Sequence, residues 1–338
     1  MTTSLTGTLA LRGNDHTTYT LEFERSAGVA WHQPVPARWV GGRRMSVVLP
    51  AHNVAYCLPK VLDALQAQAY GRGFEVIVID DASTDATAEI IATHPAVTAG
   101  LRLRKRCGAA TARNLGTYIA QGETVLYADA DMLLPPSTVA DLAARATDHT
   151  VLTGFRHNLP PDASWPDNGP ELAADHRVTW RPPVNTPLLY SGITLREPVD
   201  GRPLEHTRDF RDLGHGRMYY DWDLPRMVVT ALLAVPRAAV LDVGGFDAEF
   251  GRIGWGMEDT YLGACLIAAG LLVIPLRQAV GLHLDPPDAA QQWQRKLSTW
   301  PATLARYRAL LSEPARSGRR AALTTAMNSL LHSCEVLR

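Results

Sequence analysis

The architecture of this chain follows from one short sequence, Val76-Ile77-Val78-Ile79-Asp80-Asp81, in which an apolar run ends in two carboxylates. A second stretch repeats the arrangement, because Val125-Leu126-Tyr127-Ala128 runs into Asp129-Ala130-Asp131. Short apolar, β-branched runs are typical of strands that are buried on both faces, as in a parallel sheet. Ligands of open α/β sheets bind in the crevice beyond the carboxyl ends of the strands. We therefore expect both acidic strand ends to face one crevice that holds a divalent cation and the anionic group it neutralises.

Strand and helix patterns alternate from residue 46 to residue 147, which predicts a mainly parallel sheet with helices on both faces. The preceding residues 1–44 alternate only weakly between polar and apolar, and we interpret them as a β hairpin. The stretch 158–226 is rich in proline and aromatic residues and shows little periodicity. A loop of this length in a compact domain is typically functional or poorly ordered. Two helices are expected in the tail, over about 289–311 and 315–336.

The composition excludes several classes of protein. The 338 residues carry a net charge of −1, without the basic stripe and high pI that are typical of nucleic-acid binders. The four cysteines include no CxxC pair, which argues against a structural zinc site or a disulfide framework and fits a reducing compartment. No signal peptide is evident, and no apolar run reaches the ~18 residues of a membrane span. We expect a soluble, cytoplasmic protein.

Several motifs, taken together, resemble the family 2 glycosyltransferases of the GT-A fold. The order and spacing match as well as the letters in Leu49-Pro50-Ala51-His52-Asn53, Val78-Ile79-Asp80-Asp81-Ala82-Ser83-Thr84-Asp85, Ala112-Arg113-Asn114-Leu115-Gly116 and Asp129-Ala130-Asp131. The second half resembles the C-terminal part of β-1,4-galactosyltransferase-type enzymes in Gly244-Gly245-Phe246-Asp247, Gly254-Trp255-Gly256-Met257-Glu258-Asp259 and His283. The resemblance covers roughly Met45–Phe155 and Val228–Asp285.

This resemblance implies a Rossmann-like GT-A fold and an inverting, metal-dependent transfer of a sugar from a nucleotide-diphosphate donor, UDP-linked rather than GDP-linked. We divide the chain accordingly into an N-terminal β extension (1–44), a nucleotide-sugar-binding half (45–155), an acceptor-binding and catalytic half (156–288) and a helical tail (289–338). The 158–226 segment is expected to shape the acceptor pocket.

The resemblance also assigns the cation site. Asp131 would ligate Mn²⁺ or Mg²⁺, and Asp129 would lie nearer the ribose or a metal-bound water, since both ions prefer oxygen ligands. His283 is a candidate third ligand, because imidazole suits Mn²⁺ better than Mg²⁺. A lone histidine is equally compatible with a structural role. An Asp-x-Asp at a strand end is, on its own, also compatible with a loop cap.

Asp80 and Asp81 occupy the positions at which the family contacts the nucleotide base and ribose. A carboxylate accepts hydrogen bonds from a uracil N–H or a ribose hydroxyl. Pro50, Ala51 and His52 would form the neighbouring wall of the base pocket. Arg113 would reach the diphosphate, and an ion pair with Asp80 or with Asp129 is an equal alternative.

Asp259 is the candidate general base. An inverting transfer needs a carboxylate that takes the proton of the acceptor hydroxyl while its oxygen attacks the anomeric carbon. Glu258 would hold an acceptor or donor hydroxyl, and Trp255 offers an apolar face to a sugar ring. The alternative for Glu258 and Asp259 is ordinary complementation of a helix N-terminus.

Two rival functions remain. A nucleotidyltransferase would also use a parallel sheet and acidic ligands, but the place of its glycine-rich phosphate loop is taken here by Pro50-Ala51-His52-Asn53. A nucleotide-sugar-binding protein without catalysis is opposed only by the presence of both acidic motifs. The acceptor, a hydroxyl or amine of a small molecule or glycan, is not defined by the sequence.

Overall fold

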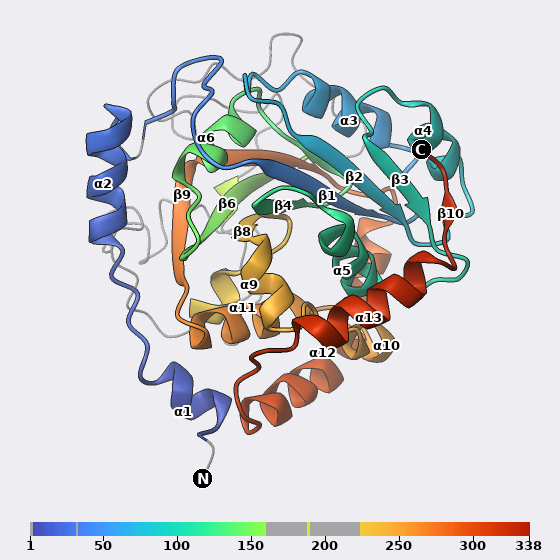
Figure 1. The fold of residues 1–338 in the computed structure, drawn as a ribbon. Coiled ribbons are helices and arrows are strands. Elements are labelled where there is room, and N and C mark those ends of the chain that lie inside the picture. Colours follow the sequence, from blue (N-terminus) through green and yellow to red (C-terminus); the bar gives the residue numbers. More distant parts are fainter. Residues whose placement is uncertain (1–2, 32, 160–187, 190–223) are drawn as a thin grey trace.

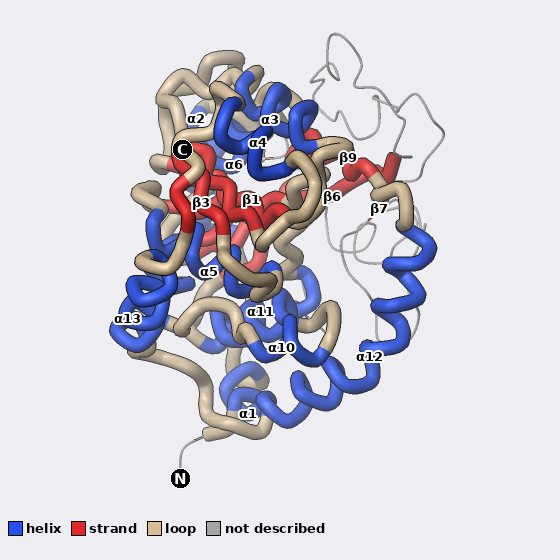
Figure 2. Tube along the Cα trace, turned by 90° about the vertical axis from the view of Figure 1, so that its right-hand side faces the viewer, coloured by secondary structure: helices blue, strands red, loops and turns tan. Residues whose placement is uncertain are grey.

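A twisted central sheet lies between two layers of helices (Figures 1 and 2). The computed structural model describes residues 3–31, 33–159, 188–189 and 224–338. The strands run over Met45–Ala51 (β1), Glu75–Asp80 (β2), Ala99–Arg102 (β3), Thr124–Ala128 (β4), Met132–Leu133 (β5), Thr150–Leu159 (β6), Leu188–Leu189 (β7), Leu232–Pro236 (β8), Leu272–Leu284 (β9) and Glu335–Val336 (β10). The expected α/β fold is confirmed.

The described strands form one ten-stranded sheet in the order β10-β3-β2-β1-β4-β8-β6-β9-β5, with β7 beside β6. The neighbours β3, β2, β1 and β4 are parallel, as the sequence predicts. Beyond β4 the sheet is mixed, because β8 is antiparallel to both β4 and β6, whereas β6 and β9 are parallel. The carboxyl ends of β1, β2 and β4 therefore lie along the same edge.

The helices cover both faces of this sheet. They run over Leu5–Leu9 (α1), Thr17–Ala27 (α2), Leu58–Gln66 (α3), Thr87–Thr93 (α4), Ala109–Ile119 (α5), Thr138–Arg145 (α6), Arg237–Asp242 (α9), Glu249–Ile253 (α10), Glu258–Ala268 (α11), Ala289–Leu311 (α12) and Arg320–Leu331 (α13), with a 3₁₀ turn (η2) at Leu224–Met227. In Figure 1, α3, α4 and α6 lie on one face and α5, α9, α11 and α13 on the other.

The apolar runs are continuous because each strand buries both of its faces. In β1, Val47 and Leu49 join the core under α3 and α6, whereas Val48 points into the core under α5 and α11. All three side chains are fully buried. The two cores hold the strand ends rigidly in place, which is the requirement for a precise site along that edge.

The expected N-terminal β hairpin is wrong. The described part of residues 1–44 forms α1 and α2 instead. Tyr19 and Phe23, which fitted an alternating strand, are also one helical turn apart, and Phe23 packs edge-on against Trp31 with ring centroids 5.4 Å apart. A short apolar pattern fits either period, and this tertiary contact favours the helix.

The C-terminal tail is helical, as expected, but its last helix is shorter than predicted. Helix α13 ends at Leu331, and Glu335–Val336 then pairs with β3 as an antiparallel edge strand. Chain termini are thus brought to opposite ends of the molecule (Figure 1). Within the part of the chain that the structure describes, none of the helices combines the length and apolar character that a membrane crossing requires.

Candidate active site

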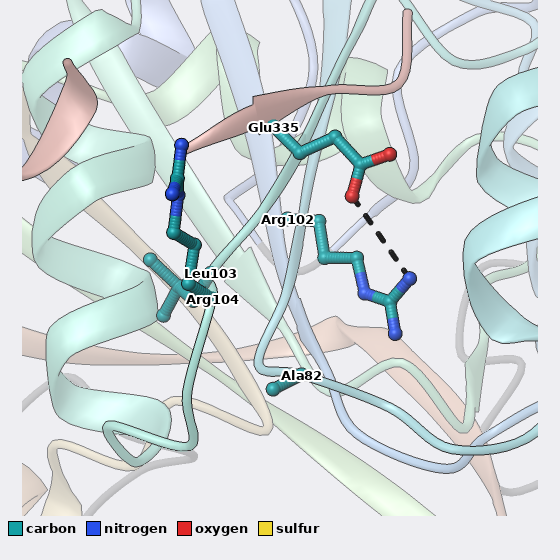
Figure 3. Close-up of a pocket in the computed structure, with 5 residues that line it drawn as sticks. All are labelled: Ala82, Arg102, Leu103, Arg104 and Glu335. Carbon is teal, nitrogen blue, oxygen red and sulfur yellow. Dashed lines mark ion pairs between the residues drawn. The ribbon is translucent and has the colours of Figure 1, made fainter. Parts of the chain in front are cut away.

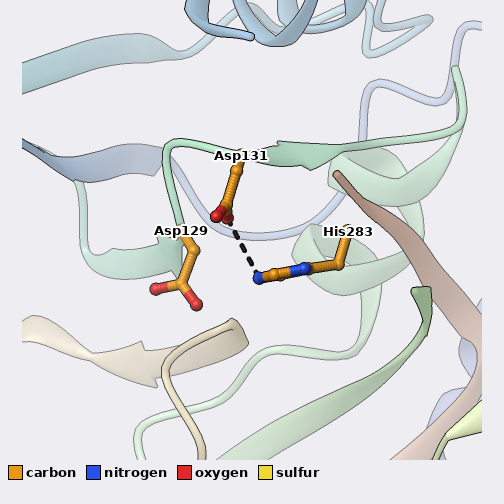
Figure 4. Close-up of side chains that lie close together, drawn as sticks. All are labelled: Asp129, Asp131 and His283. Atoms are coloured by element: carbon orange, nitrogen blue, oxygen red, sulfur yellow. Dashed lines mark ion pairs between the residues drawn. The ribbon is translucent and has the colours of Figure 1, made fainter. Parts of the chain in front are cut away.

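Asp129, Asp131 and His283 meet at the edge of the sheet (Figure 4), where their ligand atoms all lie within 4.8 Å of one another. The two aspartates follow β4. His283 comes from β9, and the antiparallel pairing of Met132 with His283 places the imidazole beside Asp131. The separation between His283 Nε2 and Asp131 Oδ1 is 3.3 Å. The three candidate cation ligands are therefore brought together by strand pairing between segments that lie far apart in the sequence.

These residues fit a bound divalent cation. Asp131 Oδ1 is buried and accepts no hydrogen bond from the described residues. Burial raises the pKa of Asp131 to about 6, although His283 opposes the shift. A cation would supply the missing partner of this oxygen. The Asp–Asp–His donor set suits Mn²⁺.

His283 is oriented by a second carboxylate, since its Nδ1 lies 3.2 Å from Asp285 Oδ1. Burial lowers the pKa of His283, but Asp131, Asp285 and Asp129 together outweigh burial and the net pKa is raised. A carboxylate on the far ring nitrogen fixes the tautomer and strengthens the imidazole as a ligand. Asp285 is thus placed to orient the ring.

Arg113 joins the cation cluster to the candidate base. Its guanidinium, on α5, lies 2.9 Å from Asp129 and 3.8 Å from Asp259. Of the alternatives considered from the sequence, the structure shows the ion pair with Asp129 and no contact with Asp80 among the described residues. The Arg113 Nε and Nη1 atoms are buried without hydrogen-bond partners, so the side chain can still donate to a further anion.

Glu258 and Asp259 are the first residues of α11. The preceding Met257 adopts a left-handed conformation with φ of 74°, which is uncommon for a side chain of this size and turns the chain sharply into the helix. Burial and the neighbouring Asp259 raise the pKa of Glu258 to about 7. Burial also raises the pKa of Asp259, but Arg113 and hydrogen bonds from Thr230 oppose the shift. Buried carboxylates whose pKa values are raised beside a charged partner in this way are typical of functional sites.

The Gly254-Trp255-Gly256 loop precedes these acids, and helix α12 holds it in place. The Trp255 ring is half exposed, and the Lys296 ammonium lies 4.8 Å from its centroid. Thr299 accepts a hydrogen bond from the Trp255 backbone N–H at 3.3 Å. A β carbon on Gly254 would meet Thr299 at 2.3 Å, so only glycine allows this approach. Trp255 therefore presents an apolar surface beside the two carboxylates.

The carboxylates of Asp80 and Asp81 are bound by groups of the neighbouring loops. Asp80 is fully buried, and its carboxylate accepts the Ser83 N–H and lies 3.2 Å from Arg102 Nε. The Asp81 carboxylate accepts the N–H groups of Cys107 and Gly108 at 2.6 and 2.8 Å. Both carboxylates thus stabilise the loops around the crevice.

The proposed wall of the base pocket is assembled by short contacts between β1 and β2. The Asp81 N–H donates to the Ala51 carbonyl, and the ring of His52 contacts the Asp81 carbonyl through Nδ1, each at 2.8 Å. Pro50 pairs with Ile79 in the parallel register. These three residues therefore lie beside the Asp80–Asp81 turn.

A hollow of about 400 Å³ opens on the other side of this turn (Figure 3). It is lined by Ala82, Arg102, Leu103, Arg104 and Glu335. The arginines belong to the basic run Arg102-Leu103-Arg104-Lys105-Arg106, and Glu335 comes from β10, a strand that the sequence did not predict. None of the cation-cluster residues lines it.

The Pro-rich 158–226 segment, which we expected to shape the acceptor pocket, lies almost entirely outside the described residues. Sequence reasoning also missed Thr230 and Lys296. The sequence around Thr230 contains no motif that marks a functional threonine, and Lys296 fits the pattern of a solvent-exposed lysine on a helix.

Part of this chain matches a known family of proteins. Residues 46–189 match the family model described as Glycosyl transferase family 2. A validoxylamine A glucosyltransferase of Streptomyces hygroscopicus subsp. jinggangensis is 29% identical over 251 residues, which cover 71% of this chain and 55% of that protein. The chain thus spans about half the length of the curated relatives it matches.

Two solved structures share the fold. A mannosyltransferase from Pyrobaculum calidifontis in complex with GDP-Man and Mn²⁺ is 20% identical, with a TM-score of 0.52 over 94% of this chain and 77% of that one. GalNAc-T7 with UDP, GalNAc and Mn²⁺ is 17% identical, with a TM-score of 0.51 over 86% of this chain and 55% of that one. The match to the family 2 model covers residues 46–189, the likeness to the two solved structures concerns the fold, and the Gly254–Asp259 motif lies beyond the family match.

Proposed function

We propose that this chain is an inverting, metal-dependent glycosyltransferase that moves a hexosyl or N-acetylhexosaminyl group from a UDP-sugar to a hydroxyl or amine of an acceptor. The observation that carries the proposal is the position of Arg113. Its guanidinium contacts Asp129 of the cation cluster and lies within 4 Å of both Glu258 and Asp259. Donor activation and acceptor deprotonation can therefore occur at adjacent positions.

The donor would bind along the carboxyl ends of β1, β2 and β4. Asp131, Asp129 and His283 would hold Mn²⁺ or Mg²⁺, which supplies charge neutralisation to the departing diphosphate. Arg113 has unpartnered N–H groups with which to bind the same diphosphate. The base and ribose would lie against Pro50, Ala51, His52 and the Asp80–Asp81 turn.

The acceptor would lie over Trp255. Asp259 takes the proton from the acceptor hydroxyl or amine as its oxygen or nitrogen bonds to the anomeric carbon. The bond from that carbon to the diphosphate oxygen breaks, and the leaving diphosphate keeps the electron pair. Attack from the face opposite the leaving group inverts the anomeric centre. Glu258, whose raised pKa keeps it partly protonated near neutral pH, can donate a hydrogen bond to a sugar hydroxyl.

The relative and the structural neighbours support a sugar transfer but differ in donor and acceptor. The neighbours were solved with GDP-Man in one case and with UDP and GalNAc in the other. The name validoxylamine A glucosyltransferase indicates a small-molecule acceptor for that relative. We favour a UDP-sugar because of the sequence resemblance, and a small-molecule or glycan acceptor because of the relative's name, with a β-1,4-galactosyltransferase-like arrangement of residues 244–259.

The test is release of nucleoside diphosphate from a panel of UDP-, GDP- and TDP-sugars, with and without Mn²⁺, using pooled amine and polyol acceptors. We expect Asp259→Asn to lower transfer about 10²- to 10⁴-fold, the range for loss of a general base, while UDP binding changes little. Asp242→Asn, which removes one partner of an exposed ion pair with Arg320, is the control. Transfer at the parental rate by Asp259→Asn would refute this mechanism. Donor binding without turnover would indicate a binding protein, and nucleotidyl transfer would indicate the rival enzyme.

A further inference from the structure

Thr230 donates hydrogen bonds to the candidate base Asp259 from both its hydroxyl and its backbone N–H. It lies two residues before β8 and is fully buried. Its hydroxyl donates to Asp259 Oδ1 and Oδ2 at 2.9 and 3.0 Å, and its backbone N–H donates to Oδ2 at 3.2 Å. The next residue, Ala231, accepts the backbone N–H of Asp129 at 3.4 Å. One short segment therefore touches both acidic motifs.

We infer that Thr230 is a positioning residue that holds Asp259 ionised and turned toward the acceptor. This inference rests on the proposed function. It adds a role for a residue outside the family match and outside every motif that the sequence displays.

The hydrogen-bond chemistry supports this role. The Thr230 N–H can only donate, and the single hydroxyl proton is shared between the two carboxylate oxygens, so the Asp259 carboxylate accepts two donors from this residue. A carboxylate that accepts two or three such bonds is stabilised in its charged form. Each oxygen keeps a further lone pair for the proton of the acceptor. A buried threonine without these bonds would lose stability relative to valine, because its hydroxyl would be desolvated without compensation.

The other charged groups around Asp259 do not provide this orientation. Arg113 approaches from α5 at 3.8 Å, beyond hydrogen-bond distance, and is already paired with Asp129 at 2.9 Å. Asp129, after β4, and Glu258, on the same helix, are both acidic and oppose ionisation when charged. Tyr127, on β4, hydrogen-bonds Thr117. Thr230 is thus the residue whose described contacts fix the direction of the carboxylate.

The experiment compares Thr230→Val, Thr230→Ala and Thr230→Ser. Removal of the hydroxyl by valine or alanine should lower kcat about 10- to 100-fold, since hydrogen bonds to charged groups are the strong ones. The acid limb of the kcat–pH profile should move to higher pH, because Asp259 loses donors that favour its charged form. The KM for the donor should change less than about threefold, and serine should restore both kcat and the pH profile.

Thr138→Val is the matched control, because Thr138 is buried and its hydroxyl has no hydrogen-bond partner among the described residues. It should leave kcat and the pH profile unchanged. The use of both valine and alanine guards against a fold defect in either, and thermal unfolding would reveal such a defect.

A second readout does not need turnover. The Asp259 carboxylate band can be followed by infrared titration and identified by its loss in Asp259→Asn. Its midpoint should rise in Thr230→Val and Thr230→Ala and return in Thr230→Ser. An unchanged midpoint, or an unchanged kcat–pH profile in an active parent, would overturn the inference alone. If the variants show the infrared shift but the parent protein transfers no sugar, the positioning role stands and the proposed function is refuted.

Discussion

The ends of β2 and β4 have similar sequences, yet their carboxylates have different bonding partners in the structure. At β2, Asp80 and Asp81 are buried and are bound by Arg102 and by the N–H groups of residues 83, 107 and 108. At β4, Asp131 Oδ1 is buried without a hydrogen-bond partner among the described residues, with His283 Nε2 at 3.3 Å and Asp129 close by. Asp80 Oδ2 likewise accepts no hydrogen bond from the described residues, but it lies 3.2 Å from the guanidinium of Arg102. We propose that Asp131, whose ion-pair partner is a histidine rather than an arginine, is the carboxylate available to a cation.

The largest effect should come from Asp131→Ala. We expect transfer to fall more than about 10³-fold and Mn²⁺-dependent UDP binding to be lost, since removal of a buried ligand disrupts the cation site. Isothermal titration with UDP and Mn²⁺ measures the binding. The same titration on Asp81→Asn should keep Mn²⁺ affinity within a few fold. If the two variants lose the ion equally, the contrast between the strand ends is wrong.

Asp81→Ala should instead destabilise the fold. Two backbone N–H groups lose their acceptors, which we expect to cost about 2–3 kcal/mol of unfolding free energy. Urea denaturation monitored by circular dichroism checks the value. Asp81→Asn keeps one acceptor oxygen and should lose about half as much. A loss below that of typical surface substitutions would show that the 103–108 loop does not depend on this carboxylate.

The two strand ends should also differ in their dependence on pH. Burial raises the pKa of Asp131 to about 6 in the folded protein, whereas the unfolded chain releases this proton near the ordinary aspartate value of 3.8. The folded state therefore binds more protons in this window, and the unfolding free energy of the metal-free protein should fall by about 1–3 kcal/mol as pH rises through it. The raised pKa of His283 has the same sign and extends the loss to higher pH.

Denaturation midpoints measured from pH 4 to pH 7 test this dependence. Asp131→Asn should flatten the slope, and saturating Mn²⁺ should reverse it at the upper end by binding the ionised carboxylate. Because Glu258 contributes a slope of the same sign, Glu258→Gln is the parallel control. A slope that persists unchanged in both variants would contradict the assignment.

The smallest effect should come from Glu335→Ala. The Glu335–Arg102 pair spans 4.0 Å with both side chains partly exposed, so its loss should change unfolding free energy by less than about 0.5 kcal/mol. Mn²⁺ and UDP affinities measured in parallel should stay the same. A marked loss of UDP affinity would instead place the hollow of Figure 3 within the donor site.

The sequence was sufficient to predict β1, β2 and β4, because strands that are buried on both faces carry continuous apolar runs. It did not predict β3, whose sequence Ala99–Arg102 contains no such run. It could not predict the partner of Arg113, since Asp80 and Asp129 are equally suitable in charge and only packing chooses between them. The same limit applies to Thr230, whose contact with Asp259 links residues 29 positions apart. The terminal strand β10 was missed because two residues carry no periodicity, and its pairing with β3 decides their conformation.

Helix α12 restricts how the Gly254-Trp255-Gly256 loop can move. Thr299 and Trp300 fill the space above Gly254 and Gly256, and the long helix lies along the outside of the molecule (Figure 2). Any rearrangement of the tryptophan loop during turnover must carry this helix with it or break the contact. Exchange of the loop between relatives to alter acceptor choice should therefore succeed only when residues 289–311 are transplanted together with it.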